Sequence, residues 1–304
     1  MKKTIWVVMA AVLLSILIGC GQSDSERKRA NELRQKANIQ AYQLAFKVGV
    51  MPTLDCLPIY ILHDSLLYDT THADIRLVHY AAQMDCDTAM ENGRVDACVT
   101  DLVRAQHLKR KGVMLRWFAS TNAYWNLYGG KQENLKSIEG LADKSIALAR
   151  YSITDYLTTS VLRRAKLKRP ALRVQINDVF VRMNMAEGNE LDAFWFTEPM
   201  ATKMKLDGNK MLFSSQDLAL RPGVIALVSI PRKDAKRYEA QLAEFRKSYN
   251  RAVELINQRG LVYYSDLIVK YMGVDNKTVM NLPKITFEPA QEPRMSDLKR
   301  LQQQ

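Results

Sequence analysis

Two stretches of the chain follow one pattern: MENGRVDACVTD at residues 90–101 and MAEGNELDAFWFTE at residues 185–198. Each reads as the end of a helix, a glycine at its C-cap, an Asp-Ala pair that opens a buried strand, and then Thr followed by a carboxylate. The glycine suits the left-handed conformation of a helix cap. Because α/β proteins bind ligands at the carboxyl edge of the sheet, the Thr-Asp and Thr-Glu pairs are candidate ligand contacts. Any two strand–helix units could share this pattern, so the generic interpretation stays open.

Around these stretches, short β-rich runs alternate with segments whose apolar residues recur at helical spacing. The predicted strands are residues 45–50, 75–80, 95–99, 113–118, 145–149, 173–177, 193–196, 210–213 and 224–228, with an extended stretch at 124–128. The predicted helices are residues 58–68, 86–91, 102–111, 154–167, 179–187, 199–206, 234–258, 264–271 and 276–280. This alternation with short connections predicts an α/β fold with parallel sheets.

Length and composition bound the fold and the partners. The chain has 304 residues, which exceeds the size at which single cores stop growing, so two lobes are expected. With 47% hydrophobic and 25% charged residues, the composition excludes a disordered or collagen-like chain. The net charge of +12 would suit a nucleic-acid partner, but the basic residues fall in short clusters at predicted helix ends without interleaved aromatic residues. We therefore expect a solvated basic surface and no nucleic-acid partner.

The N-terminus is typical of a targeting signal. Lys2 and Lys3 precede an apolar run at residues 5–18 that is too short to span a bilayer as a helix. The sequence Leu-Ile-Gly-Cys at residues 17–20 resembles the lipobox of bacterial lipoproteins, in which the cysteine is acylated. We expect residues 1–19 to be a signal peptide, Cys20 the lipidation site, and residues 20–44 a polar tether and N-terminal segment. An ordinary signal peptide followed by an unrelated cysteine is the alternative.

Several motifs resemble those of ABC-transporter solute-binding lipoproteins, nearest to the branch for nitrate, sulfonates, taurine and thiamine precursors. They are the Gly and Asp-Ala pattern in each half, LKSIEGLADKSIAL at residues 135–148, RYSIT at 150–154, WFTEP at 195–199 and KVGV at 47–50. The resemblance covers roughly residues 45–257. It implies a type II periplasmic-binding-protein-like fold, with two α/β lobes joined by two crossovers around a central ligand cleft, and a C-terminal helical segment.

The resemblance also implies domain boundaries, partners and location. Lobe 1 would comprise residues 45–128 with 223–304, and lobe 2 residues 129–222. The protein would be a monomer in the bacterial cell envelope, anchored through Cys20 and facing the periplasm or the outside. It would capture a small-molecule solute by hinge closure and deliver it to a membrane permease driven by an ATPase. An enzyme on the same two-lobed fold, acting on a small aromatic acid or pyrimidine, and a sensory lipoprotein without transport are the alternatives.

The predicted ligand contacts lie at the strand-to-helix loops and near the first crossover. They are Thr53, Asp55, Thr100, Asp101, Tyr124, Trp125, Ser152, Thr154, Trp195 and Glu198. Hydroxyls at helix N-termini would cradle a polar or anionic headgroup, although the same residues could be plain N-caps. The three carboxylates could receive an amine or heterocyclic N–H, or pair with a nearby Lys or Arg. The aromatic rings could stack on a ligand or pack as core.

These acids and rings favour a ligand with a ring or an amine, such as a thiamine-precursor pyrimidine, over a sulfonate or nitrate anion. No motif for a hydrolase nucleophile, a zinc protease, a P-loop or a dinucleotide site occurs in the sequence, so we expect no catalytic residues, cofactor or metal. Cys56, Cys86 and Cys98 would remain after lipidation of Cys20. One disulfide with a free thiol, or three buried thiols, are both compatible with the sequence.

Overall fold

The computed structural model describes residues 24–229 and 234–302, so the predicted signal peptide and Cys20 lie outside the described residues. The chain divides into two compact units, residues 1–45 and 46–304. In the first unit, helix α2 spans Asp24–Leu44, and the described side chains along it are almost all exposed. The sequence predicts a polar tether and N-terminal segment over residues 20–44. The segment forms a helix because it is rich in Arg, Lys, Glu, Gln and Ala, which favour helix.

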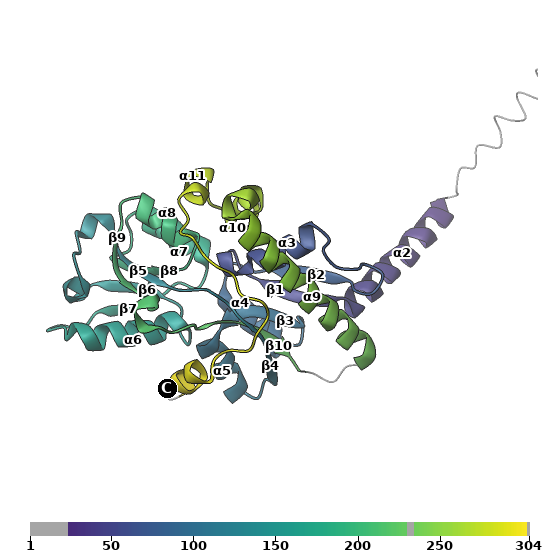
Figure 1. Ribbon diagram of the computed structural model, residues 1–304, viewed down its shortest axis with the longest axis horizontal. Helices are drawn as coiled ribbons and strands as arrows, with labels where there is room; N and C mark the ends of the chain where they lie inside the picture. The colour runs from purple at the N-terminus through teal and green to yellow at the C-terminus, as the bar shows by residue number, and fades with distance from the viewer. Residues whose placement is uncertain (1–23, 230–233, 303–304) are drawn as a thin grey trace, which may run out of the picture. The chain divides into compact units, whose positions relative to one another are not determined.

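The second unit contains two five-stranded sheets (Figure 1). The first has the strand order β2-β1-β3-β10-β4. Its strands are β1 (Phe46–Val50), β2 (Ile75–His79), β3 (Ala97–Asp101), β4 (Leu115–Ser120) and β10 (Gly223–Val228). Every residue of β1, β3 and β10 is buried, so these three strands form the centre of the core.

The second sheet has the order β7-β6-β8-β5-β9. Its strands are β5 (Asn126–Gly129), β6 (Ser145–Leu148), β7 (Leu172–Gln175), β8 (Ala193–Phe196) and β9 (Lys210–Ser214). The chain thus passes from the first sheet to the second between β4 and β5, and returns between β9 and β10. Position by position, the two sheets have the same topology.

The prediction of purely parallel sheets was wrong at one strand of each sheet. Strand β10 pairs antiparallel with β3 and β4, and β5 pairs antiparallel with β8 and β9. These are the two strands that follow the crossings between sheets. A strand reached through a βαβ crossover starts at the end of the sheet where its neighbours start, and it runs parallel to them. A strand that enters from the other sheet starts at the end where its neighbours finish, and it therefore runs antiparallel to them.

The repeated sequence pattern occupies equivalent positions in the two sheets. The Asp96 carboxylate accepts a hydrogen bond from the backbone N–H of Lys47 at 2.7 Å, and Asp192 accepts one from Ser145 at the same distance. Each Asp therefore fixes the start of the neighbouring parallel strand. The predicted glycine cap is confirmed at Gly93, which has φ 60°, but in the second copy the left-handed residue is Asn189, with φ 59°.

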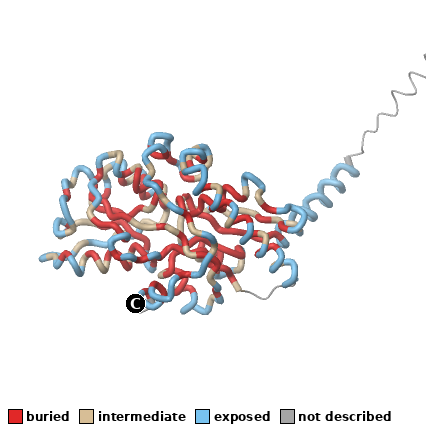
Figure 2. Tube along the Cα trace, in the orientation of Figure 1, coloured by how far each residue is buried: buried red, intermediate tan, exposed pale blue. Residues whose placement is uncertain are grey.

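Helices cover both sheets, and the buried residues concentrate in the strands between them (Figure 2). The helices of this unit are α3 (Leu57–Asp64), α4 (Gln83–Glu91), α5 (Leu102–Arg110), α6 (Ile153–Ala165), α7 (Val179–Glu187), α8 (Met200–Leu206), α9 (Ala235–Arg259), α10 (Ser265–Met272), α11 (Asn276–Met280) and α12 (Met295–Gln302). Short 3₁₀ turns lie at residues 54–56, 131–133, 138–141, 215–218 and 261–264. All nine predicted helices are present, α7 and α11 with the predicted ends and the others with shifted ends, whereas α12 is not among the predictions. Among the described residues, none of the helices combines the length and apolar character needed to cross a membrane.

The C-terminal segment contacts elements of both sheets. Helix α9 buries Leu242, Phe245, Tyr249 and Val253 at helical spacing and packs against α3. Helix α11 then contacts α8 beside the second sheet, and α12 returns to pack on α5 (Figure 1). This path places the chain between α11 and α12 across the region where the two sheets are connected.

Candidate ligand-binding site

A cavity of about 80 Å³ lies between the loops that follow the carboxyl ends of β1 and β3 and those that follow β6, β7 and β8. Both sheets therefore contribute to one site, as the switch-point rule for α/β proteins predicts. Seven of the predicted contacts line this cavity. They are Thr53, Asp55, Thr100, Asp101, Trp125, Ser152 and Thr154.

The loop after β1 holds a buried carboxylate. Asp55 accepts hydrogen bonds from the hydroxyl of Thr53 at 2.6 Å and from that of Thr121 at 2.9 Å. Burial raises the pKa of Asp55, and the two hydroxyl donors partly offset that rise. The alternative of a salt bridge to a Lys or Arg has no counterpart among the described contacts of this carboxyl group. Thr53 makes no side-chain cap hydrogen bond, so its hydroxyl serves the carboxylate instead.

Asp101 connects the two halves of the cavity. One of its carboxylate oxygens caps helix α5 by accepting from the backbone N–H of Arg104 at 3.0 Å. The same oxygen accepts from the backbone N–H of Ile153 on the opposite side at 3.1 Å. Burial raises the pKa of Asp101 to about 6, against the opposing effects of the Arg104 charge and of these two N–H donors.

The hydroxyls of Ser152 and Thr154 are engaged within their own loop. Ser152 donates to the carbonyl of Ala149 at 2.6 Å and accepts from the backbone N–H of Thr154 at 3.1 Å, which makes it the N-cap of α6. Thr154 accepts from the backbone N–H of Ala149 at 3.1 Å. The N-capping interpretation therefore describes Ser152 here, although both residues also border the cavity.

Three predicted contacts do not line the cavity. Trp195 is completely buried in the second sheet, where its indole N–H donates to Thr158 at 2.9 Å. Glu198 accepts from the backbone N–H of Thr202 at 3.0 Å and from the Tyr124 hydroxyl at 3.0 Å. Burial raises the pKa of both Glu198 and Tyr124. Glu198 and Tyr124 thus form a hydrogen-bonded pair beside the cavity.

The remaining two predicted contacts, Thr100 and Trp125, border the cavity. Thr100 accepts a hydrogen bond from the side-chain amide of Gln83 at 3.2 Å. The backbone of Trp125 exchanges two 2.8 Å hydrogen bonds with Ser215, one of them to its hydroxyl, which fixes the first crossover. The half-buried indole of Trp125 borders the cavity, where it could contact an apolar part of a ligand.

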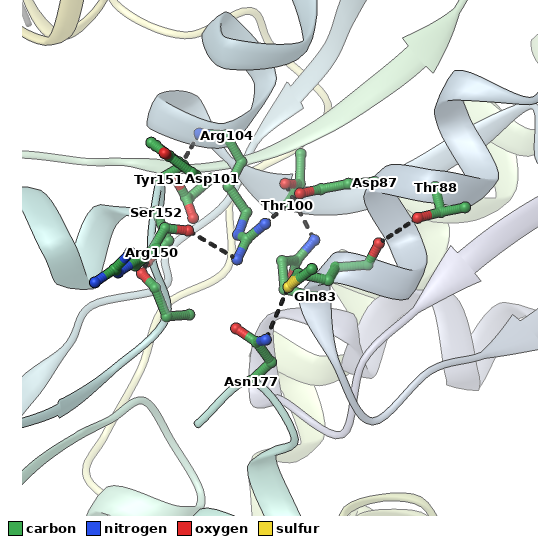
Figure 3. A network of polar contacts seen from close by, with 12 residues as sticks. Gln83, Asp87, Thr88, Thr100, Asp101, Arg104, Arg150, Tyr151, Ser152 and Asn177 are labelled. Carbon is green, nitrogen blue, oxygen red and sulfur yellow. Dashed lines mark hydrogen bonds and ion pairs between the residues drawn. The ribbon is translucent and has the colours of Figure 1, made fainter. Parts of the chain in front are cut away.

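The cavity also contains a buried arginine that the sequence did not single out. The Arg104 guanidinium is only 2% exposed, forms an ion pair with Asp87, and donates to the carbonyl of Arg150 at 3.3 Å. Figure 3 shows this side chain lying between Asp87 and the segment of Arg150 to Ser152, with Gln83 and Asn177 nearby. Within the described structure its Nε has no hydrogen-bond partner.

A second buried arginine borders the same cavity from the second sheet's side. Arg182 on α7 donates to the carbonyl of Ile176 at 2.5 Å, and its guanidinium lies 5.1 Å from the centre of the Phe196 ring. Burial lowers the pKa of Arg182 to about 10; the Asp178 charge opposes this shift, and the smaller effect of the Arg104 charge adds to it. Its Nε also has no partner among the described residues.

Both arginines carry a sequence signal that could have identified them. Arg104 and Arg182 lie in or beside the first turn of α5 and α7, at the helix ends that point to the sheet edge. A cation is disfavoured at a helix N-terminus because the helix dipole is positive there. A buried arginine in that position therefore requires another stabilising partner, such as Asp87 or an anionic ligand.

Backbone contacts join the two sides around the cavity. The backbone N–H of Leu54 donates to the carbonyl of Glu198 at 2.8 Å, and that of Val179 donates to Ala81 at 2.9 Å. Together with the Asp101–Ile153 contact, these bonds hold the loops of the two sheets against each other. The conformation is therefore one in which the cleft is closed over a small cavity.

Neither metal ligands nor a disulfide mark this site in the described part of the chain. No group of three or more His, Cys, Asp and Glu side chains could hold a metal ion among the described residues. Cys56, Cys86 and Cys98 are free and buried, which corresponds to the alternative of three buried thiols.

The fold is shared with proteins of known structure. The chain is similar to the alkanesulfonate-binding protein SsuA from Xanthomonas axonopodis pv. citri bound to MOPS, with a TM-score of 0.68, 16% identity, and coverage of 84% of this chain and 89% of that one. It is also similar to the periplasmic aliphatic sulphonate binding protein SsuA from Escherichia coli, with a TM-score of 0.65, 17% identity, and coverage of 85% and 89%.

A third similar structure is the periplasmic nitrate-binding protein NrtA from Synechocystis PCC 6803, with a TM-score of 0.64, 11% identity, and coverage of 77% and 68%. The chain has the periplasmic-binding-protein fold. These neighbours belong to the group that the sequence motifs resemble, and the predicted fold class is confirmed. No protein-family model matches the sequence, and no curated protein sequence matches it.

Proposed function

We propose that this protein is the solute-binding component of an ABC importer and that it captures a small solute with an anionic group between its lobes. One observation carries the proposal. Arg104 and Arg182 approach a single cavity from opposite sides, each is buried, and each has a guanidinium N–H without a partner among the described residues. A buried cation with an unused donor is costly unless a ligand completes it.

The chemistry of these groups favours oxygen-rich anions. A guanidinium group presents several N–H donors in one plane, which matches the oxygens of a sulfonate, nitrate or carboxylate. The N-terminal ends of α5, α6 and α7 also surround the cavity and add positive dipole ends. The sulfonate- and nitrate-binding proteins with this fold are consistent with such a ligand.

The expectation of a thiamine-precursor pyrimidine has less support. It relied on Asp55, Asp101 and Glu198 as acceptors for a ligand amine, yet each of these carboxylates accepts hydrogen bonds from the protein. Glu198 also lies off the cavity lining. We therefore favour the anion and retain the pyrimidine as the competing outcome of the binding experiment.

The remaining parts of the proposal concern location and partners. We propose that Cys20 carries the lipid anchor and that α2 belongs to the segment between this anchor and the binding unit. The protein would act as a monomer at the cell envelope, close on its solute by hinge motion, and release it to a membrane permease. The lobe boundaries proposed from the sequence, 45–128 with 223–304 and 129–222, would be the bodies that move.

The test is calorimetric titration with methanesulfonate, taurine, nitrate and a 4-aminopyrimidine, using the purified protein and two arginine variants. Arg182→Met should abolish or greatly weaken anion binding, whereas Arg169→Met, at an exposed surface pair with Asp143, should leave it unchanged. Binding of the pyrimidine alone, or anion binding that is equal in both variants, would contradict the proposed ligand.

A further inference from the structure

A pair of aromatic rings lies across the boundary between the two sides of the cavity. His107 on α5 and Tyr151 in the loop after β6 stack with ring centres 4.7 Å apart and planes inclined by 5°. Neither residue belongs to the cavity lining. The pair therefore joins the two sides from outside the space that a solute would occupy.

His107 shares a helix face with the buried arginine of the cavity. It follows Arg104 by three residues on α5, and residues with this spacing lie one above the other on a helix. Along this face, Arg104 donates to the carbonyl of Arg150, and His107 stacks on the adjacent Tyr151. One face of α5 thus makes consecutive contacts with the loop of the other sheet, first in the cavity and then beyond it.

The backbone of Tyr151 is held in an unfavourable conformation. Its φ of 58° places it in the left-handed region, which a residue with a bulky side chain rarely adopts. Its backbone N–H donates to Asp155 at 3.2 Å, and the next residue, Ser152, caps α6. Strain of this kind persists where surrounding contacts fix the backbone, and it is common at ligand clamps.

The side chain of Tyr151 gains little from burial. Tyr151 is 60% exposed, whereas large aromatic residues usually bury most of their surface. The ring of Tyr151 stacks on that of His107. A strained, exposed tyrosine whose ring meets the opposite side is better explained by closure of the cleft than by packing of its own loop.

We propose that His107 and Tyr151 form a latch that holds the cleft closed and thereby slows release of the solute. The inference rests on the proposed function, because the closed cleft matters only if a solute enters and leaves it. The latch contributes a contact that exists in the closed form and is lost on opening. Removing it shifts the equilibrium toward the open form.

The experiment measures opening directly and needs no ligand. Spin labels are attached at Met114→Cys, after α5, and at Arg163→Cys, on α6, both at exposed positions in the full-length protein. Double electron–electron resonance then gives the ratio of open to closed molecules. Cys20 is replaced by Ser in every variant, and the native cysteines at 56, 86 and 98 are buried, so the introduced thiols are the ones expected to react.

The key comparison is between two variants of Tyr151. Tyr151→Asn removes the ring but tolerates the left-handed backbone, whereas Tyr151→Phe keeps the ring. We expect Tyr151→Asn and His107→Ala each to raise the open-to-closed ratio roughly two- to tenfold, as for other aromatic pairs, and Tyr151→Phe to match the parent. The double variant should open no further than either single variant, since both remove the same contact.

Three results would overturn the latch. They are an unchanged distance distribution in Tyr151→Asn, independent and additive effects of the two substitutions, and a parent protein that is fully open without ligand. Circular dichroism and thermal melting check that each variant is folded. If the proposed anion fails to bind, the calorimetric titration shows it, while the ligand-free distances still decide whether the two rings hold the cleft closed.

Discussion

Arg104 and Arg182 border the same cavity, but the two sides of the protein compensate their charges differently. Arg104 forms an ion pair with Asp87 and lies close to Asp101, whose buried carboxyl group caps the same helix. Among the described residues, Arg182 forms no ion pair; the charge of Asp178 acts on it at longer range, and a backbone carbonyl and the Phe196 ring contact its guanidinium. The first side is therefore balanced by a direct ion pair, whereas the second leaves a buried positive charge only partly compensated beside the cavity.

This difference suggests separate roles for the two arginines. A side chain that is already paired fixes the structure of the site, and its removal leaves a carboxylate without its cation. A side chain that is unpaired gains most from an incoming anion, and its removal should cost the empty protein little. Substitutions on the two sides should therefore separate stability from binding.

The largest effect is expected for Arg104→Met, measured by urea denaturation. Because Asp87 would be left buried without its partner, we expect the free energy of unfolding to fall by about 4 kcal/mol at pH 7. The double variant Arg104→Met with Asp87→Leu should recover most of this loss. An equal loss in the single and double variants would show that the ion pair is not the cause.

The next effect is a pH dependence that originates at Asp101. Its pKa is raised to about 6 in the folded protein, from about 3.9 in the unfolded chain, so the folded state binds the proton more tightly. Stability should therefore fall as pH rises from 4 to 6. Asp101→Asn lacks this titration. Its free energy of unfolding relative to that of the parent should therefore rise by about 3 kcal/mol from pH 4 to pH 6. If the unfolding free energies of the parent and the variant change in parallel with pH, Asp101 is not the origin of the pH dependence.

Arg182→Met should affect binding rather than stability. A hydrogen-bonded charged contact contributes about 1.5–3 kcal/mol, so the affinity for methanesulfonate should fall by roughly 30-fold. The melting temperature of the empty protein should stay the same or rise, because a buried and only partly compensated charge has been replaced by an apolar side chain. A loss of stability as large as that of Arg104→Met would show that the two arginines do not have separate roles.

The smallest effect is expected for Glu198→Gln. Gln keeps one oxygen that can accept from the Thr202 N–H, its amide NH2 can donate to the Tyr124 hydroxyl oxygen, and Glu198 lies off the cavity lining. Anion affinity measured by calorimetry should change by less than about threefold. A larger gain in anion affinity would indicate that the Glu198 charge acts on the ligand despite its position.

The strand arrangement could be predicted because the deciding residues act locally. The Asp-Ala pairs predict buried strands, and Asp96 and Asp192 are indeed fixed at equivalent strand starts. The antiparallel direction of β5 and β10 could not be read from their short apolar runs, since direction depends on where the chain enters each sheet. Helix α12 was missed because its few apolar residues gave no clear pattern at the end of the chain.

The site was predicted only to the level of loops. Asp101 and Glu198 occupy related positions in the repeat, yet Asp101 faces the cavity while Glu198 turns to the N-terminus of α8. Sequence gives the order of residues along a strand, but the orientation of a side chain beyond its end depends on the following helix. Arg104 and Arg182 do not stand out by composition, because only their positions in or beside the first turn of a helix, where the dipole disfavours a cation, distinguish them from surface arginines.

The position of β10 has a consequence for how the chain folds during synthesis. Residues 126–214 supply every strand of the second sheet without interruption, so that sheet can form as soon as they are made. The first sheet must wait, because β10 fills the place between β3 and β4 but is synthesised long after both. Until then these two strands have open edges, which are prone to mispairing with other chains. Completion of the first sheet is therefore a late event, and a chain truncated before residue 223 would retain only the second sheet intact.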